Sequence, residues 1–144
     1  MSEVALPAPA DLLPHRPPFL LLDELVALEP GVGASGRWRL DAGLDFFAGH
    51  FPGRPTTPGV LMVEALAQVG ACALLADERY AGRLPLFGGI ERARFRRQVL
   101  PGDVLELSVT LERMSAKGGR GVGRATVDGE RACEATMLFV LVDP

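Results

Sequence analysis

Residues 46–76, FFAGHFPGRPTTPGVLMVEALAQVGACALLA, contain the features that decide the fold. A glycine-flanked turn at 49–53 carries a histidine, and a second turn leads into a helix expected over 60–76. Thr57 is the expected N-cap, with Pro58 at the first helical position, where its missing N–H costs nothing. The helix is apolar or small on almost every side, which predicts that it is buried all round.

Glu64 and Gln68 interrupt this apolar pattern, and their i,i+4 spacing puts them on one face of the helix. A buried carboxylate is costly unless it has a partner or a chemical task. One interpretation is a structural glutamate bonded to Gln68 or to backbone groups. The other is a catalytic acid, because His50 in the turn could act as a base and the N–H groups at the helix start could bind an oxyanion.

The bulk composition limits the possible classes of protein. The 144 residues are enough for one domain, expected over 1–144, and 48% apolar residues exclude disorder. A net charge of −3 argues against a nucleic-acid partner. The only candidate membrane segment, 60–76, is too short to span a bilayer and carries Glu and Gln, so we expect no membrane association.

The cysteines and histidines indicate a reducing compartment and no metal. Cys72 lies in the expected helix and Cys133 in a strand-like run, where buried thiols stay reduced and inert. The N-terminus lacks the pattern of a signal peptide, so we expect a cytoplasmic protein. Two histidines and two distant cysteines do not provide metal-ligand spacing.

The rest of the chain reads mainly as strands. We expect them over 19–29, 36–40, 87–99, 104–114 and 130–142, with a further glycine-containing strand before the Asp128-Gly129 hairpin turn. Short helical turns are expected at 11–13 and 41–48. An antiparallel sheet that curves around one buried helix satisfies this pattern, and the predicted class is α+β.

The central stretch resembles the signature of the 3-hydroxyacyl-[acyl-carrier-protein] dehydratases, which are hot-dog-fold enzymes of bacterial fatty acid synthesis. The resemblance is carried by Gly49-His50-Phe51-Pro52-Gly53, Pro58-Gly59-Val60-Leu61 and Glu64-Ala65-Leu66-Ala67-Gln68. Further matching segments span nearly the whole chain in order, at 13–16, 18–21, 94–97, 101–103 and 133–137.

The resemblance implies dehydration of a (3R)-3-hydroxyacyl-[acyl-carrier-protein] to the trans-2-enoyl thioester in type II fatty acid biosynthesis. It implies His50 as the base at C2, Glu64 of the partner subunit at the leaving hydroxyl, and the Gly59 N–H at the thioester oxygen. Phe51, Val60 and Gln68 are the further implied substrate and oxyanion positions. No cofactor is implied beyond the phosphopantetheine of the carrier. Glutamate rather than aspartate at position 64 favours a dehydratase without isomerase activity.

The implied partners are a second copy of the chain and an acidic acyl carrier protein. The minimal unit is a homodimer with a continuous sheet and an acyl tunnel along its interface, assembled as a hexamer of three dimers. Four arginines form a local basic region: Arg92, Arg94, Arg96 and Arg97. This region is either a solvated strand face or the docking site for the carrier protein.

Two alternatives remain open on the residues alone. A hot-dog thioesterase would attack the thioester carbonyl with water, and a non-catalytic acyl-binding scaffold would keep the tunnel without the chemistry. Departures from the family pattern at Pro17, Thr56, Thr57 and Gln98 leave the acyl-chain preference open rather than the reaction.

Overall fold

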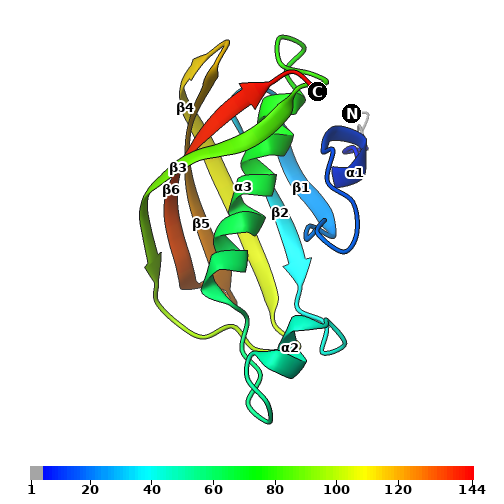
Figure 1. Cartoon of the computed structure of the whole chain (residues 1–144), viewed down its shortest axis with the longest axis vertical. Coiled ribbons are helices and arrows are strands. Elements are labelled where there is room, and N and C mark those ends of the chain that lie inside the picture. Colours follow the sequence, from blue (N-terminus) through cyan, green and yellow to red (C-terminus); the bar gives the residue numbers. More distant parts are fainter. Residues whose placement is uncertain (1–4) are drawn as a thin grey trace.

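The chain forms one antiparallel sheet that curves around a single long helix (Figure 1). A computed structural model describes residues 5–144. The sheet order is β1-β2-β4-β5-β6-β3. The strands are β1 (Glu24–Glu29), β2 (Gly33–Arg39), β3 (Leu84–Phe95), β4 (Val104–Ser115), β5 (Gly118–Val127) and β6 (Glu130–Val142). The helices are α1 (Pro9–Leu12), α2 (Phe46–Gly49) and α3 (Gly59–Leu75). The predicted α+β hot-dog architecture is confirmed.

The core lies between α3 and the inner face of the sheet. Alternate residues of β4 are buried, as the sequence pattern predicts: Leu105, Leu107, Val109 and Leu111. From Met62 to Leu75 every residue of α3 except Glu64 is buried. A helix with apolar side chains all round is therefore covered because the sheet curves around it.

Close contact between helix and sheet depends on two glycines that flank one aromatic ring. A Cβ atom on Gly70 of α3 would lie 2.8 Å from the Phe139 ring, and one on Gly121 of β5 would also lie 2.8 Å from it. The ring of Phe139 therefore fills the space that these side chains would occupy. Gly121 is one of the strand glycines between 119 and 123, and its tight surroundings explain why this part of β5 is so rich in glycine.

The start of α3 differs from the prediction in its cap. The helix begins at Gly59, one residue early, so Pro58 occupies the N-cap position and offers no side-chain acceptor. The expected N-cap, Thr57, is wrong: its Oγ1 is buried and has no hydrogen-bond partner among the described residues. Its backbone N–H donates instead to the Val99 carbonyl oxygen at 2.8 Å.

Several strand boundaries also differ from the prediction. The strand expected over 36–40 is Gly33–Arg39, and two others differ because tertiary contacts engage their backbone groups. The first strand begins at Glu24 rather than residue 19, because Phe19 and Leu21 use their backbone groups to bond the side chain of Gln68. The strand expected over 87–99 spans 84–95. Its final residues leave the sheet, and the Val99 carbonyl bonds Thr57 in the loop before α3.

The predicted Asp128-Gly129 hairpin is confirmed. Both residues have positive φ, +50° and +81°, which is the geometry of a two-residue turn whose twist matches its strands. The turn joins β5 to β6, and β6 lies in the interior of the sheet between β5 and β3, as expected.

One edge of the sheet is apolar. β3 is an edge strand, and it exposes several large apolar side chains: Leu86, Phe87, Ile90 and Phe95. An edge strand offers unpaired backbone donors and acceptors to another strand. This edge therefore has both the hydrogen-bonding groups and the apolar surface that an association between chains requires.

Both cysteines are free and buried. Burial raises the pKa of the Cys72 thiol to about 12 and that of Cys133 to about 11, so neither is a ready nucleophile. No helix within residues 5–144 has the length and apolar character needed to cross a membrane.

Candidate active site

The histidine of the central turn is held in one orientation by its neighbours. His50 follows α2, and its Nδ1 lies 2.9 Å from the carbonyl oxygen of Thr56. The Thr56 N–H donates in return to the His50 carbonyl oxygen at 2.8 Å. Because a carbonyl oxygen can only accept, Nδ1 is the donor, and the neutral ring keeps its free lone pair on Nε2. In this tautomer Nε2 is the ring nitrogen that can accept a proton.

An aromatic ring supports this histidine from one side. The rings of His50 and Phe51 are stacked, with centroids 4.1 Å apart. Phe51 is itself 54% exposed, and Val60 at the helix start is 73% exposed. The surroundings of His50 are thus apolar and open to solvent within one chain.

The N-terminus of α3 presents free backbone donors to a surface depression. The first N–H groups of a helix have no intrahelical acceptor, and no side chain caps this one. Gly59 and Val60 line a depression of about 580 Å³. A Cβ atom on Gly59 would lie 2.8 Å from the Phe95 ring, so only glycine fits beneath that ring. Donors at a positive helix end suit a developing negative charge on oxygen.

Glu64 and Gln68 form a buried network with the N-terminal segment. The Gln68 amide oxygen accepts the Leu21 N–H at 3.0 Å, which fixes the direction of its amide group. Its Nε2 donates to the Phe19 carbonyl at 2.8 Å and to Glu64 Oε2 at 2.9 Å. Burial raises the pKa of Glu64, and the hydrogen bond from Gln68 opposes that rise. The expected pairing of Gln68 with Glu64 is present in the structure.

A second histidine also lies beside this carboxylate. His15 Nε2 is 3.7 Å from Glu64 Oε2, and both residues line a small cavity of about 30 Å³. The proline-rich sequence around His15 predicts an extended segment and a structural role for this side chain. The contact joins residues 49 positions apart, and no spacing rule predicts such a pair; the one signal is that His15 lies in one of the resemblance segments.

Within one chain, His50 and Glu64 do not line a common cavity. Glu64 faces the cavity that it lines with His15, and His50 is not among the residues that line it. His50 instead follows α2, in the loop that precedes α3 (Figure 1). In the part of the chain that the structure describes, no three His, Cys, Asp or Glu side chains cluster as metal ligands.

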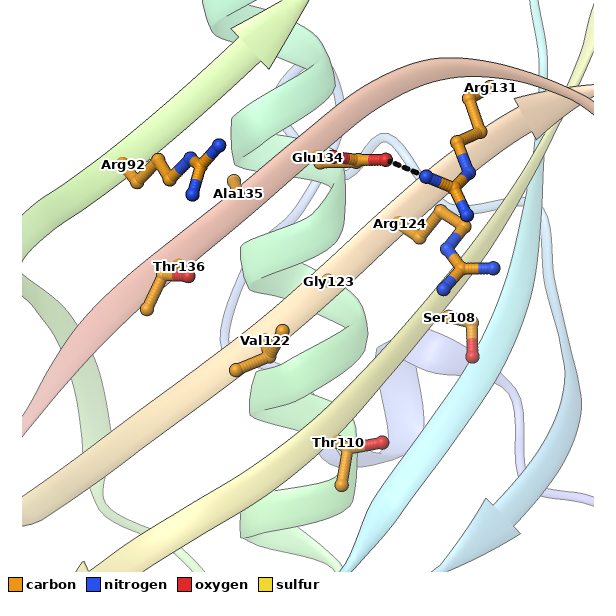
Figure 2. A pocket seen from close by; sticks show the side chains of 10 residues that line it. All are labelled: Arg92, Ser108, Thr110, Val122, Gly123, Arg124, Arg131, Glu134, Ala135 and Thr136. Carbon is orange, nitrogen blue, oxygen red and sulfur yellow. Dashed lines mark hydrogen bonds and ion pairs between the residues drawn. The ribbon is translucent and has the colours of Figure 1, made fainter.

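Three of the four arginines line one of two depressions. Arg92 pairs with Thr136 in the sheet register and lines a depression of about 560 Å³ on the sheet face away from α3 (Figure 2). Arg94 follows it opposite Glu134. Arg96 and Arg97 line the depression that contains Gly59. Arg96 also reaches Glu134, which lines the same outer depression as Arg92, so the single basic region stays a prediction.

The charged neighbours of these arginines also differ. Arg96 donates to Glu134 at 3.2 Å, and Arg97 donates to Glu130 at 3.0 Å. On the outer face, Arg131 donates to Glu134 at 2.9 Å, and this bond is drawn in Figure 2. Among the described residues, Arg92 and Arg94 make no ion pair with a carboxylate within 4 Å.

Sequence comparison relates the chain to known proteins over most of its length. The FabA-like domain family matches residues 13–136. A 3-hydroxyacyl-[acyl-carrier-protein] dehydratase FabZ from Chloroflexus aggregans is 56% identical over 133 residues, which cover 92% of each chain. The FabZ of Herpetosiphon aurantiacus is 49% identical, over 92% of this chain and 94% of that protein. The FabZ of Bacillus velezensis is 53% identical, over 91% and 93% respectively.

Solved structures share the fold at low sequence identity. The dehydratase heterocomplex ApeI:P from Xenorhabdus doucetiae superposes with a TM-score of 0.82 at 17% identity, covering 96% of this chain and 93% of that chain. A hypothetical thioesterase with coenzyme A from Streptococcus pneumoniae gives 0.65 at 10% identity, covering 83% and 85%. The same architecture thus occurs in proteins with different names, and the fold alone does not identify the reaction.

Proposed function

The chain belongs to the FabA-like family as a FabZ-type 3-hydroxyacyl-[acyl-carrier-protein] dehydratase, and we propose that His50 and Glu64 carry out its reaction. The enzyme removes water from a 3-hydroxyacyl thioester in fatty acid biosynthesis. One observation carries the assignment of the base: the Nδ1 of His50 is bonded to the Thr56 carbonyl, which leaves Nε2 free to take a proton.

The proposed chemistry assigns one task to each group. His50 Nε2 removes the proton from C2, and the electron pair of that C–H bond forms the C2=C3 double bond. The C3–O bond breaks as the Glu64 carboxyl group gives its proton to the departing oxygen, which leaves as water. The raised pKa of Glu64 supports this role, because the group must be protonated before the step.

The thioester carbonyl is polarised at the start of α3. The N–H groups of Gly59 and Val60 have no intrahelical acceptor, and we assign the thioester oxygen to them. Charge that develops on this oxygen as the C2 proton leaves is stabilised by these donors and by the helix dipole. Phe51 stacks on His50 and forms an apolar wall for the substrate.

We propose that the complete site forms between two copies of the chain. His50 and Glu64 do not line a common cavity within one chain, and β3 is an apolar sheet edge. Antiparallel pairing of β3 with its copy would give a continuous sheet and bring His50 of one subunit to Glu64 of the other. Three such dimers assembled as a hexamer complete the proposal for the quaternary structure.

The carrier protein is proposed to dock near Arg96 and Arg97. These side chains border the depression that contains Gly59, where the phosphopantetheine arm must deliver the thioester. Arg92 and Arg94, on the outer sheet face, are assigned a weaker steering role. We propose that the reaction needs no metal or resident cofactor, and that the protein acts in the reducing cytoplasm, where its buried thiols stay free.

Product analysis tests the proposed reaction. Purified protein is incubated with 3-hydroxyacyl-carrier substrates of graded chain length, and the products are separated by mass. We expect an enoyl thioester that is 18 mass units lighter than the substrate, as loss of one water requires. A free acid would identify a thioesterase instead, and unchanged substrate would identify an acyl-binding scaffold.

A further inference from the structure

The two oxygens of the Glu64 carboxyl group have different surroundings. Oε2 receives a hydrogen bond from Gln68 Nε2 at 2.9 Å and lies 3.7 Å from His15 Nε2. Among residues 5–144, no hydrogen bond or ion pair reaches Oε1. The protein therefore holds the carboxyl group by one oxygen and leaves the other free to meet a substrate.

The protonation state of His15 follows from its geometry. Its Nδ1 is buried and has no partner among the described residues. A proton on that nitrogen would be a buried donor without an acceptor, which is costly, whereas a bare lone pair costs less. The ring is therefore neutral with its proton on Nε2, the atom that faces Glu64. Burial also lowers the pKa of His15, in the same direction.

Among residues 5–144, Glu64 is the only charged group that lines the cavity with His15. The other lining residues are apolar and come from α3, β3 and β6: Ala67, Ala71, Pro85, Leu86, Phe87 and Phe139. The neighbouring guanidinium of Arg16 is directed to backbone oxygens, those of Leu13 at 2.8 Å and His15 at 2.6 Å. His15 is thus aimed at one functional group and insulated from others.

We infer that His15 is a positioning residue for dehydration: a neutral N–H donor that, with Gln68, holds Glu64 Oε2 so that Oε1 meets the leaving hydroxyl. The inference rests on the proposed role of Glu64. When Glu64 gives up its proton, the 3.7 Å contact closes to a hydrogen bond, so that His15 joins Gln68 as a second N–H donor on Oε2. A cationic His15 would ionise Glu64 before the step and remove the acid.

Two substitutions separate this role from simple packing. His15→Gln keeps an N–H donor near the position of Nε2, whereas His15→Leu fills similar space without one. We expect His15→Leu to lower kcat about ten- to hundredfold, the range of one hydrogen bond to a charged group, with KM little changed. His15→Gln should recover most of that loss. Melting temperatures identify folding defects, and His15→Met is a second donor-free variant if the leucine variant does not fold.

The pH dependence of kcat distinguishes the two roles, because a loss of packing at His15 alone would leave it unchanged. A donor on the carboxylate lowers the pKa of Glu64, so its loss raises that pKa. Activity requires protonated Glu64 and falls as pH rises through its pKa. The alkaline limb should therefore move to higher pH in His15→Leu and stay in place in His15→Gln. An unmoved limb, or equal losses of kcat in the two variants, would overturn the inference.

A background without the carboxylate separates this inference from the proposed function. In Glu64→Gln, adding His15→Leu should cause no further loss of residual turnover, because the two residues act as a unit. The same factor lost in both backgrounds would show a structural role. If Glu64→Gln alone keeps wild-type turnover, the proposed function fails. If Glu64→Gln is inactive and His15→Leu keeps full turnover, only the role of His15 fails.

Discussion

The loop before α3 and the middle of α3 organise their polar groups in opposite ways. In the loop, His50 is fixed by one carbonyl oxygen, and the side chains around it are open, with Val60 73% exposed. In the helix, Gln68 is 0% exposed and makes hydrogen bonds to three partners. Hydrogen bonds orient the functional side chain in each region, His50 in the loop and Glu64 in the helix. Only the region in the helix is shielded from water. The first region therefore requires a cover, which a second subunit would provide.

The largest effect is expected from removing the base. His50→Ala should lower turnover about a thousandfold, since general base catalysis contributes roughly that much, and should leave folding intact. The side chain stacks on the exposed Phe51 ring and makes one hydrogen bond, to the partly exposed Thr56 backbone, so the melting temperature should change little. Turnover with the carrier-bound substrate and a thermal melt are the measurements. Near-normal turnover of His50→Ala would refute the assignment of His50 as the base.

Replacing Gln68 in the middle of α3 is expected to lower the stability of the fold instead. Gln68→Leu leaves the Phe19 carbonyl and the Leu21 N–H without their partner. Each unsatisfied buried group costs about 1–3 kcal/mol, so the free energy of unfolding should fall by roughly 2–6 kcal/mol. Denaturant unfolding measures this fall, with His50→Ala as the matched control that should unfold like the wild type. A stable Gln68→Leu protein would show that the network is not a structural anchor.

Adding a methyl group at Gly59 tests whether the N-terminus of α3 binds the thioester. In Gly59→Ala, the new Cβ would lie 2.8 Å from the Phe95 ring and must displace it from the depression. We expect kcat/KM to fall by about tenfold, in line with an overpacking cost of about 1–3 kcal/mol. Gly49→Ala is the control, because nothing lies within 4 Å of a Cβ there. Equal effects of the two substitutions would contradict the assignment of the thioester oxygen to the N-terminus of α3.

The smallest effect is expected at the arginines. Arg96→Ala combined with Arg97→Ala should raise KM for a carrier-bound substrate several-fold, as surface charges typically do, and hardly change KM for a short pantetheine thioester. The effect should shrink as salt is added. The matched pair, Arg92→Ala with Arg94→Ala, should have a weaker effect because Arg92 lines the other face. Equal effects of both pairs would show that docking does not distinguish the two surfaces.

The sequence was sufficient for features that depend on local pattern. The buried helix, the face shared by Glu64 and Gln68, and the Asp128-Gly129 turn all follow from spacing and turn chemistry, and the structure has each of them. The sheet followed from alternation along β4.

Features set by tertiary contacts were not predictable in the same way. Thr57 lost its capping role because the backbone of its loop bonds to Val99. The strand expected from residue 19 begins later, because Phe19 and Leu21 bond the Gln68 side chain with their backbone groups. His15 meets Glu64 only because the N-terminal segment packs along α3. In each case a long-range partner overrides a sound local preference.

We propose that each active site combines His50 of one subunit with Glu64 of the other, and subunit mixing tests this directly. Inactive His50→Ala and Glu64→Ala proteins are mixed in equal amounts, and mass-tagged subunits report when exchange is complete. By symmetry about half of the dimers are then mixed, each with one doubly altered site and one intact site, so roughly a quarter of wild-type activity should return. If each site were built within one chain, no mixture could rebuild one. Persistent inactivity after complete exchange would contradict the account.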